Sequence, residues 1–206
     1  MPGPTERRAL TFPEEVAGWV RSHYMAAFVI LEYGSGGSTM LASELPGRAI
    51  FSVESDARWA DGVEAYITAS ERTRSSVALH RVDLGATGRW GRHKRPARWK
   101  DYWRYPVSVW EREDFRQPDL VLVDGLFRMA CTLTTLVMTQ RPVVLLFDDF
   151  MNPRDELRTV RPRHAGVLDF LEPVATRGRM AKFTIEPMGL PRQQLGRFLA
   201  TFFKSY

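Results

Sequence analysis

Residues 29–54 read VILEYGSGGSTMLASELPGRAIFSVE, and their pattern decides the fold. An apolar run ends in an acid, Glu32, and the glycine turn 34–39 follows it. A helical pattern comes next, and then a second apolar run that ends in another acid, Glu54. The stretch therefore predicts a strand, a glycine turn, a helix and a strand, a unit that suits an adenosine-containing ligand.

Two details of the turn indicate which ligand it binds. A dinucleotide fingerprint would place its third glycine at position 39, where the sequence has Thr39, and Glu32 would lie near the pyrophosphate. A cationic ligand without phosphate has no such conflict, because an acidic rim at Glu32 attracts it. The E-x-G-x-G pattern resembles the cofactor motif of class I S-adenosylmethionine-dependent methyltransferases. The alternative is a glycine turn that only connects a strand to a helix.

The resemblance implies a set of cofactor-binding residues along this stretch and at later strand ends. An acid at the end of the second strand would accept hydrogen bonds from the ribose, and Asp83 and Leu84 would contact the adenine. The set comprises Glu32, Gly34, Ser35, Gly36, Ser38, Thr39, Glu54, Ser55, Asp83, Leu84 and Asp124.

The rest of the chain alternates between strand and helix periods, which predicts an α/β fold. We expect one domain over residues 1–206, a doubly wound Rossmann-like sheet that is mostly parallel, with helices on both faces. The expected strands are 26–32, 49–54, 76–83, 119–124 and 143–147, with a C-terminal antiparallel pair at 182–186 and 198–203. The expected helices are 13–24, 38–45, a segment following Asp56, 128–139 and 155–172.

Composition is that of an ordinary globular enzyme. The chain has 206 residues, a net charge of +5 and a single cysteine, Cys131, so it can form no internal disulfide. No apolar run approaches the ~18 residues of a membrane span, and the first residues lack the apolar core of a signal peptide. We expect a cytoplasmic protein that makes no membrane contact, with a homo-oligomer left open.

Acids at the ends of two neighbouring strands predict a metal site. Asp124 ends the run DLVLVD, and Asp148-Asp149 follow the next apolar run. Three converging carboxylates need a cation, and oxygen ligands favour Mg²⁺ or another hard divalent ion. The spacing resembles metal-dependent O-methyltransferases of the catechol and macrocin type. The alternative is that Asp148 contacts the cofactor and Asp149 caps a turn.

One departure from that pattern affects the catalytic assignment. Catechol-type enzymes carry a lysine base just after the first metal aspartate, whereas this chain has Arg128, which cannot accept a proton. We assign catalytic roles to Asp124 and to Arg128, which could clamp an anionic substrate or pair with an acid. His93 and His164 are further candidates for the base.

The segment 89–117 is an insertion rich in basic and aromatic residues, such as Trp90, Trp99 and Trp103. Such a mixture holds anions and stacks on rings, which predicts a lid over a small, anionic or glycosylated substrate. The alternative is a solvated basic face with its aromatic rings packed inward. The resemblance thus implies O-methylation of a small-molecule or glycan hydroxyl. A nucleic-acid methyltransferase, disfavoured because the basic residues are confined to one insertion, and a non-catalytic cofactor-fold protein are the alternatives.

Overall fold

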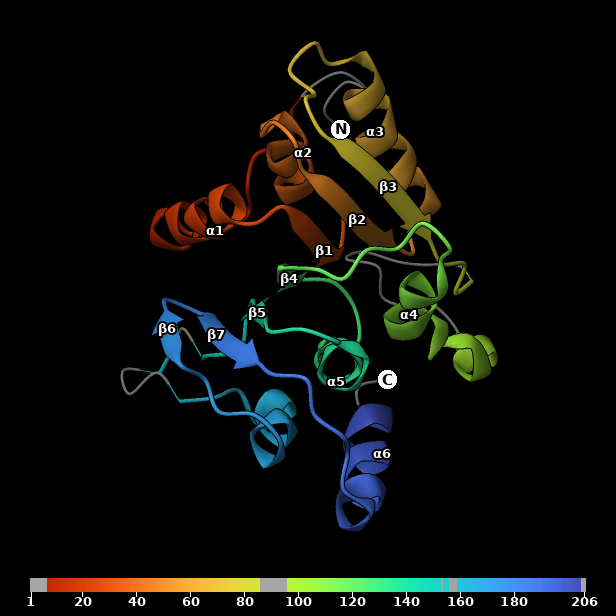
Figure 1. Cartoon of the computed structure of the whole chain (residues 1–206), viewed down its shortest axis with the longest axis vertical. Helices are drawn as coiled ribbons and strands as arrows, with labels where there is room; N and C mark the ends of the chain where they lie inside the picture. The colour runs from red at the N-terminus through yellow and green to blue at the C-terminus, as the bar shows by residue number, and fades with distance from the viewer. Residues whose placement is uncertain (1–6, 86–95, 153, 156–158, 205–206) are drawn as a thin grey trace.

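The computed structural model of this chain describes residues 7–85, 96–152, 154–155 and 159–204. Its centre is a seven-stranded sheet with the order β3-β2-β1-β4-β5-β7-β6, which can be followed in Figure 1. The first five strands are parallel, whereas β7 pairs antiparallel with β5, and β6 pairs antiparallel with β7. The strands are β1 (Val29–Tyr33), β2 (Ala49–Glu54), β3 (Ser76–Arg81), β4 (Leu120–Val123), β5 (Val143–Phe147), β6 (Ala175–Arg177) and β7 (Met180–Ile185).

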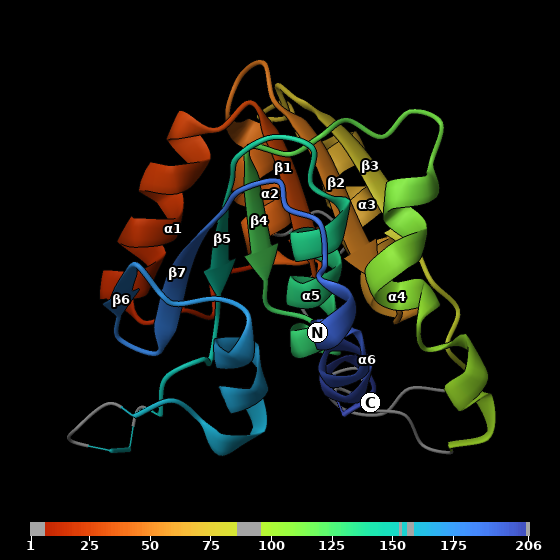
Figure 2. The same ribbon diagram turned by 60° about the horizontal axis from the view of Figure 1, so that its bottom comes forward.

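Helices cover both faces of this sheet (Figure 2). The α-helices are α1 (Glu14–Ala26), α2 (Gly37–Glu44), α3 (Ala57–Ala69), α4 (Arg104–Val107), α5 (Arg128–Met138) and α6 (Leu195–Phe203). Shorter 3-10 helices are η2 (Pro96–Asp101), η3 (Ser108–Glu111), η4 (Pro162–Asp169) and η5 (Arg192–Gln194). The predicted doubly wound fold, with its C-terminal antiparallel strands, is confirmed.

Alternate residues of the central strands supply the two faces, because side chains alternate along a strand. In β1, Ile30 packs in a cluster with α1 and α2, whereas Leu31 packs in the cluster that contains residues of α4, α5 and α6. The four residues of β4 are all buried, as expected for a central parallel strand. The predicted site residues lie at the carboxyl edge of this sheet, between the two layers of helices.

The C-terminal strand assignment was partly wrong. Residues 198–203 belong to the helix α6, in which Phe198 and Phe202 are buried one turn apart. The partner of β7 is instead the short strand β6, joined to it by a turn at Gly178 with φ +55. All three residues of β6 are exposed, so it lacks the apolar alternation that marks a strand. Where helix 155–172 was expected, the described residues form only η4, Pro162–Asp169.

In the part of the chain that the structure describes, no helix combines the length and the apolar character needed to cross a membrane.

Candidate functional site

The glycine turn lies at the carboxyl end of β1 and touches the loop after β4. Gly34 adopts φ +103, in the left-handed region that favours glycine. A Cβ at Gly34 would stand 2.8 Å from the backbone N and Cα of Gly125. The two loops approach too closely for any side chain at Gly34, which explains the first glycine of the motif.

Glu32 does not form the acidic rim that the sequence predicted. Its side chain is 0% exposed and lies beneath the turn. Its carboxylate accepts hydrogen bonds from the hydroxyls of Tyr24 in α1, Thr39 in α2 (2.5 Å) and Ser52 in β2 (3.0 Å). Burial raises the pKa of Glu32, and these hydrogen bonds oppose the rise. Glu32 thus joins three elements under the site instead of facing a ligand.

Thr39, which replaces the expected third glycine, has a clear structural role. Its hydroxyl accepts the Gly36 N–H at 3.0 Å and donates to Glu32. Ser38 and Thr39 are both buried. The Thr39 hydroxyl therefore fixes the turn to the buried acid. Direct contact of Ser38 and Thr39 with a cofactor stays a prediction.

Glu54 and Ser55, at the end of β2, have groups suited to a ribose. One Glu54 carboxylate oxygen accepts the N–H groups of Ser55 at 2.7 Å and Asp56 at 2.8 Å, and the other accepts that of Ser35 at 3.3 Å. Burial raises the pKa of Glu54 and outweighs these bonds. The Ser55 hydroxyl is buried and has no hydrogen-bond partner among the described residues. A rigid carboxylate beside an unsatisfied hydroxyl fits a ligand that presents vicinal hydroxyls.

Asp83 and Leu84 lie just past β3, which ends at Arg81 and not at Asp83 as predicted. Leu84 is buried, whereas Asp83 is exposed and accepts the Gly85 N–H at 2.8 Å. The pair therefore offers an apolar side chain next to a polar one at the edge of the sheet.

The described part of the insertion has some aromatic rings packed inward, as in the second alternative, and others exposed, and its role as a lid over a substrate stays a prediction. Tyr105 and Trp110 pack inward: Tyr105 lies against Gly125, and Trp110 donates to the Tyr33 hydroxyl at 2.7 Å. In contrast, Trp99 and Trp103 are 60% and 44% exposed. The segment 86–95, which includes Trp90 and His93, lies outside the described residues.

Arg128 is held entirely by the ends of β4 and β5. Its guanidinium donates to the backbone carbonyls of Gly125 (3.0 Å), Asp124 (3.0 Å) and Asp148. It also contacts the Asp124 carboxylate at 3.1 Å. Of the two roles predicted for Arg128, the structure shows the pairing with an acid, whereas catalysis stays a prediction.

The three carboxylates predicted to bind a metal are paired with arginines instead. Arg179 donates to Asp148 at 2.8 Å, and Arg161 donates to Asp149 at 2.9 Å. Over the described residues, no group of three or more His, Cys, Asp or Glu side chains is placed to hold a metal ion. The predicted site at Asp124, Asp148 and Asp149 therefore does not fit a divalent cation, since guanidinium groups already supply the counter-charge.

Two titratable groups near this edge have strongly shifted pKa values. Burial raises the pKa of Asp124 well above its usual range; Arg128 opposes the rise, and neighbouring Asp148 adds to it. His164 packs against Phe147 and Phe150, and burial lowers its pKa to about 3. His164 is therefore a weak proton acceptor enclosed by aromatic rings, which makes it a poor candidate for the base.

The sequence analysis missed two residues that contact the glycine turn. Trp59, in the helix expected after Asp56, donates its indole N–H to the Ser35 carbonyl at 2.6 Å. Arg8 stacks on the Trp59 ring at 3.6 Å from its centroid. Neither forms a motif in sequence, because each reaches the turn from a different element. The sequence offered one signal, a tryptophan in the first turn of the helix that follows Glu54.

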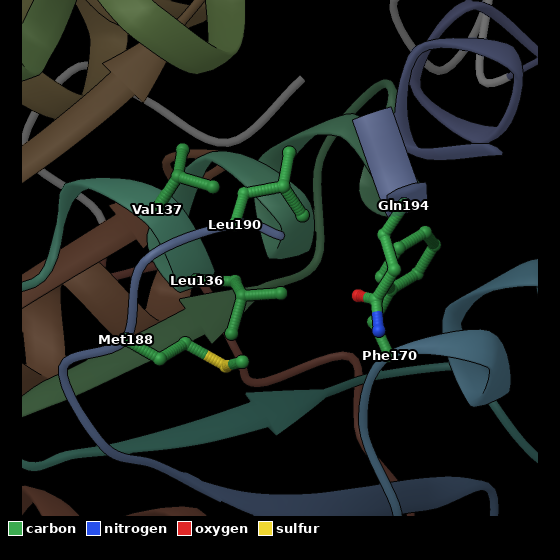
Figure 3. A pocket seen from close by; sticks show the side chains of 6 residues that line it. All are labelled: Leu136, Val137, Phe170, Met188, Leu190 and Gln194. Atoms are coloured by element: carbon green, nitrogen blue, oxygen red, sulfur yellow. The ribbon is translucent and has the colours of Figure 1, made fainter. Parts of the chain in front are cut away.

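A small apolar pocket of about 10 Å³ lies elsewhere, between the end of α5 and the segment before α6 (Figure 3). Its walls are Leu136, Val137, Phe170, Met188, Leu190 and Gln194. It has room for about one water molecule. Since the end of α5 points away from the carboxyl edge, this pocket is separate from the candidate site.

Comparisons with known proteins agree with this geometry. No family model matches the chain, and neither does any curated protein sequence. Among solved structures, a methyltransferase-like protein, SPO2022 from Silicibacter pomeroyi DSS-3, is 42% identical, with a TM-score of 0.86 over 96% of this chain and 98% of that one. Cofactor-bound Rv0187 from MTB is 14% identical, with a TM-score of 0.56 over 89% and 85% of the two chains, and shares the fold. The chain therefore belongs to the family of the Silicibacter methyltransferase-like protein and has the class I fold of S-adenosylmethionine-dependent methyltransferases.

Proposed function

We propose that this protein is an S-adenosylmethionine-dependent methyltransferase that binds its cofactor at the carboxyl edge of β1, β2 and β4. The observation that carries the proposal is the pair formed by Glu54, held by three backbone N–H groups, and the unsatisfied hydroxyl of Ser55. The ribose hydroxyls of an adenosyl group would donate hydrogen bonds to the Glu54 carboxylate and accept one from the Ser55 hydroxyl. Membership of a methyltransferase-like family supports the same conclusion.

The residues around the turn would position the cofactor in distinct ways. Gly34 and Gly36 carry no side chain and would let the ligand approach the backbone of the turn, and Asp83 with Leu84 would face the adenine. When bound, S-adenosylmethionine supplies a methyl group on a cationic sulfur.

The methyl acceptor would bind beside Asp124. Its side chain is 25% exposed, whereas that of Asp148 is 1% exposed, so Asp124 is the more accessible carboxylate at the ends of β4 and β5. We assign Asp124 the role of taking the proton from an acceptor hydroxyl. Arg128 would hold the loop that carries Asp124 without touching the acceptor.

We further propose that the acceptor is a small molecule or a glycan with a hydroxyl group and a negative charge. The exposed rings of Trp99 and Trp103 lie on the insertion that packs against Gly125 through Tyr105. Aromatic rings of this kind stack on sugars or planar groups. Lys100, which lies 5.9 Å from the Trp99 ring centroid, adds positive charge beside them.

Ligand-dependent thermal unfolding tests the proposal. S-adenosylhomocysteine should stabilise the protein by about 2.7 kcal/mol at ~100 times its dissociation constant, whereas NAD should have no effect, because Thr39 occupies the position of the third glycine of a dinucleotide fingerprint. Equal stabilisation by NAD, or none by S-adenosylhomocysteine, would contradict the assignment. Binding without transfer of a labelled methyl group to a panel of hydroxyl acceptors would support a non-catalytic protein instead. Binding to nucleic acid that weakens steeply with salt would favour a nucleic-acid substrate.

A further inference from the structure

We propose that Arg8 is a positioning residue of the cofactor site, which acts through Trp59 on the glycine turn. The inference rests on the proposed function and adds to it a residue from outside the sheet and its helices. Arg8 belongs to the segment 7–10, which precedes α1 in sequence and crosses the start of α2 and the first turn of α3 in space.

This segment lies directly on the start of α2. A Cβ at Gly37, the first residue of α2, would stand 2.6 Å from the carbonyl oxygen of Ala9 and 2.8 Å from that of Arg8. The backbone N–H of Arg8 also donates to the sulfur of Met40 in α2 at 3.2 Å. The approach is so close that only glycine fits at position 37, which explains the second glycine of the pair Gly36-Gly37.

Trp59 connects the segment to the turn. Its indole N–H donates to the Ser35 carbonyl at 2.6 Å, and its ring lies 3.8 Å from where a Cβ of Gly36 would stand. The N–H of the same Ser35 donates to Glu54 at 3.3 Å. Trp59 therefore fixes Ser35, the residue whose N–H also contacts the ribose-binding acid.

Arg8 holds Trp59 in this position. Its guanidinium carbon lies 3.6 Å from the Trp59 ring centroid, a distance that gives a close cation–π contact. A Cβ at Gly62, one turn further along α3, would stand 2.3 Å from Nη2 of Arg8, so Gly62 leaves the space that the guanidinium fills. Contacts therefore run from Arg8 to Trp59, to Ser35 and to Glu54.

The hydrogen bonding of Arg8 also distinguishes it from a surface arginine. Its Nη1 is buried and has no hydrogen-bond partner among the described residues. Burial lowers the pKa of Arg8, and the negative charge of Glu54 opposes this shift. A buried donor left unsatisfied costs free energy, so a role in stability alone does not explain an arginine here.

Arg7 provides a matched control in the same segment. It forms an ion pair with Glu44, at the end of α2, at 3.0 Å. Among the described residues, Arg7 forms no ion pair or hydrogen bond with Trp59 or the glycine turn. The variants Arg7→Met and Arg8→Met remove the same charge from adjacent positions.

Calorimetric titration with S-adenosylhomocysteine tests the inference. Arg8→Met should raise Kd about tenfold, whereas Arg7→Met should change it by about twofold or less. Arg8→Lys should restore only part of the affinity, because an ammonium group cannot stack flat on the indole. Titrations at a temperature where every variant is folded separate affinity from stability.

A double variant tests whether Arg8 acts through Trp59. Trp59→Phe keeps an aromatic ring and loses the N–H to Ser35, so it should also weaken binding. If Arg8 acts through Trp59, the Kd of the double variant Arg8→Met/Trp59→Phe should rise by less than the product of the two single effects.

Three results would overturn the inference: an unchanged Kd in Arg8→Met, an equal loss in Arg7→Met, or fully multiplicative effects in the double variant. A wild-type protein that does not bind S-adenosylhomocysteine overturns the proposed function and this inference together. Wild-type binding with any of the three results above overturns this inference alone.

Discussion

At the scale of single residues, the acid of the glycine motif is a structural centre of the site. Glu32 occupies the middle of the sheet, between Ser52 on β2 and Leu122 on β4, and is closed from solvent. Hydroxyls from α1, α2 and β2 surround its carboxylate. A buried carboxylate with this many donors fixes the position of all three elements.

The buried acid predicts a pH dependence of stability. Burial raises the pKa of Glu32 above its ordinary value of 4.5, so the folded state holds a proton that the unfolded state has lost. This contribution to the free energy of unfolding is present below pH 4.5 and decreases as the pH rises through the raised pKa. Glu32→Gln removes the titration, so its stability relative to wild type should increase with pH over that window.

Urea unfolding at several pH values measures this difference. Glu113→Gln, at an exposed position, is the control and should follow the wild type at every pH. If the difference in free energy of unfolding between Glu32→Gln and the wild type does not change with pH across the window, Glu32 has the same pKa in the folded and unfolded states.

The residues of the motif could be predicted from sequence, but the direction of their side chains could not. The acids at 32 and 54 look equivalent in the pattern, yet Glu32 is fully buried and Glu54 is only partly buried. The difference comes from Tyr24 and Thr39, which reach Glu32 from helices on one face of the sheet. Such contacts depend on how the helices pack on the sheet, and the spacing of apolar residues along the sequence does not specify that packing.

At the scale of elements, Arg128 joins the ends of two neighbouring strands. It precedes the rest of α5 and donates to carbonyls after β4 and after β5. The residue before it, Phe127, adopts φ 49 in the left-handed region, where a bulky residue is unfavourable. Its ring stacks on Tyr102 at 5.1 Å, which anchors the insertion to the same loop.

Removal of this guanidinium should weaken the carboxyl edge of the sheet. Arg128→Met leaves several carbonyls and the Asp124 carboxylate without their donor, and we expect the free energy of unfolding to fall by about 2–4 kcal/mol. Arg128→Lys should recover little, because one ammonium cannot reach the same set of acceptors.

Chemical denaturation measures both variants against Arg197→Met. Arg197 forms an exposed pair with Asp169 at 3.8 Å, and its loss should cost less than about 1 kcal/mol. A loss in Arg128→Met as small as that of Arg197→Met would show that Arg128 does not join the strands.

Elements with a strong apolar period were predictable, and those without one were not. The predicted bounds of β2 and β5 match the structure, since β5 is a continuous apolar run and β2 is apolar except for Ser52 and the terminal Glu54. The exposed β6 gave no such signal, and the phenylalanines of α6 fit an alternating pattern as well as a helical one. The choice between them depends on which other elements α6 packs against, namely α5.

At the scale of the whole molecule, the chain supplies its own cations to its acidic edge. The net charge is +5, and arginines from three separate parts of the chain converge on the end of β5. They are Arg128 from the start of α5, Arg161 from the segment before η4 and Arg179 from the turn before β7. The sequence correctly predicted that three neighbouring carboxylates need positive charge close by. It could not show that this charge comes from arginines far apart in the sequence and not from a metal ion.

This arrangement predicts that Mg²⁺ has no effect on the protein. A hard cation binds carboxylates whose negative charge it neutralises, whereas Arg179 and Arg161 already neutralise Asp148 and Asp149. Millimolar Mg²⁺ should therefore give no calorimetric heat and no thermal shift with S-adenosylhomocysteine bound, at pH 8 as at pH 5.5. Asp149→Asn should lower stability by weakening the pair with Arg161 and leave the response to Mg²⁺ absent. A thermal shift with Mg²⁺ at pH 8 that disappears at pH 5.5 would be the behaviour of ligating carboxylates. That result would mean that the arginines give way to a metal, and a metal-assisted mechanism would then replace the one proposed here.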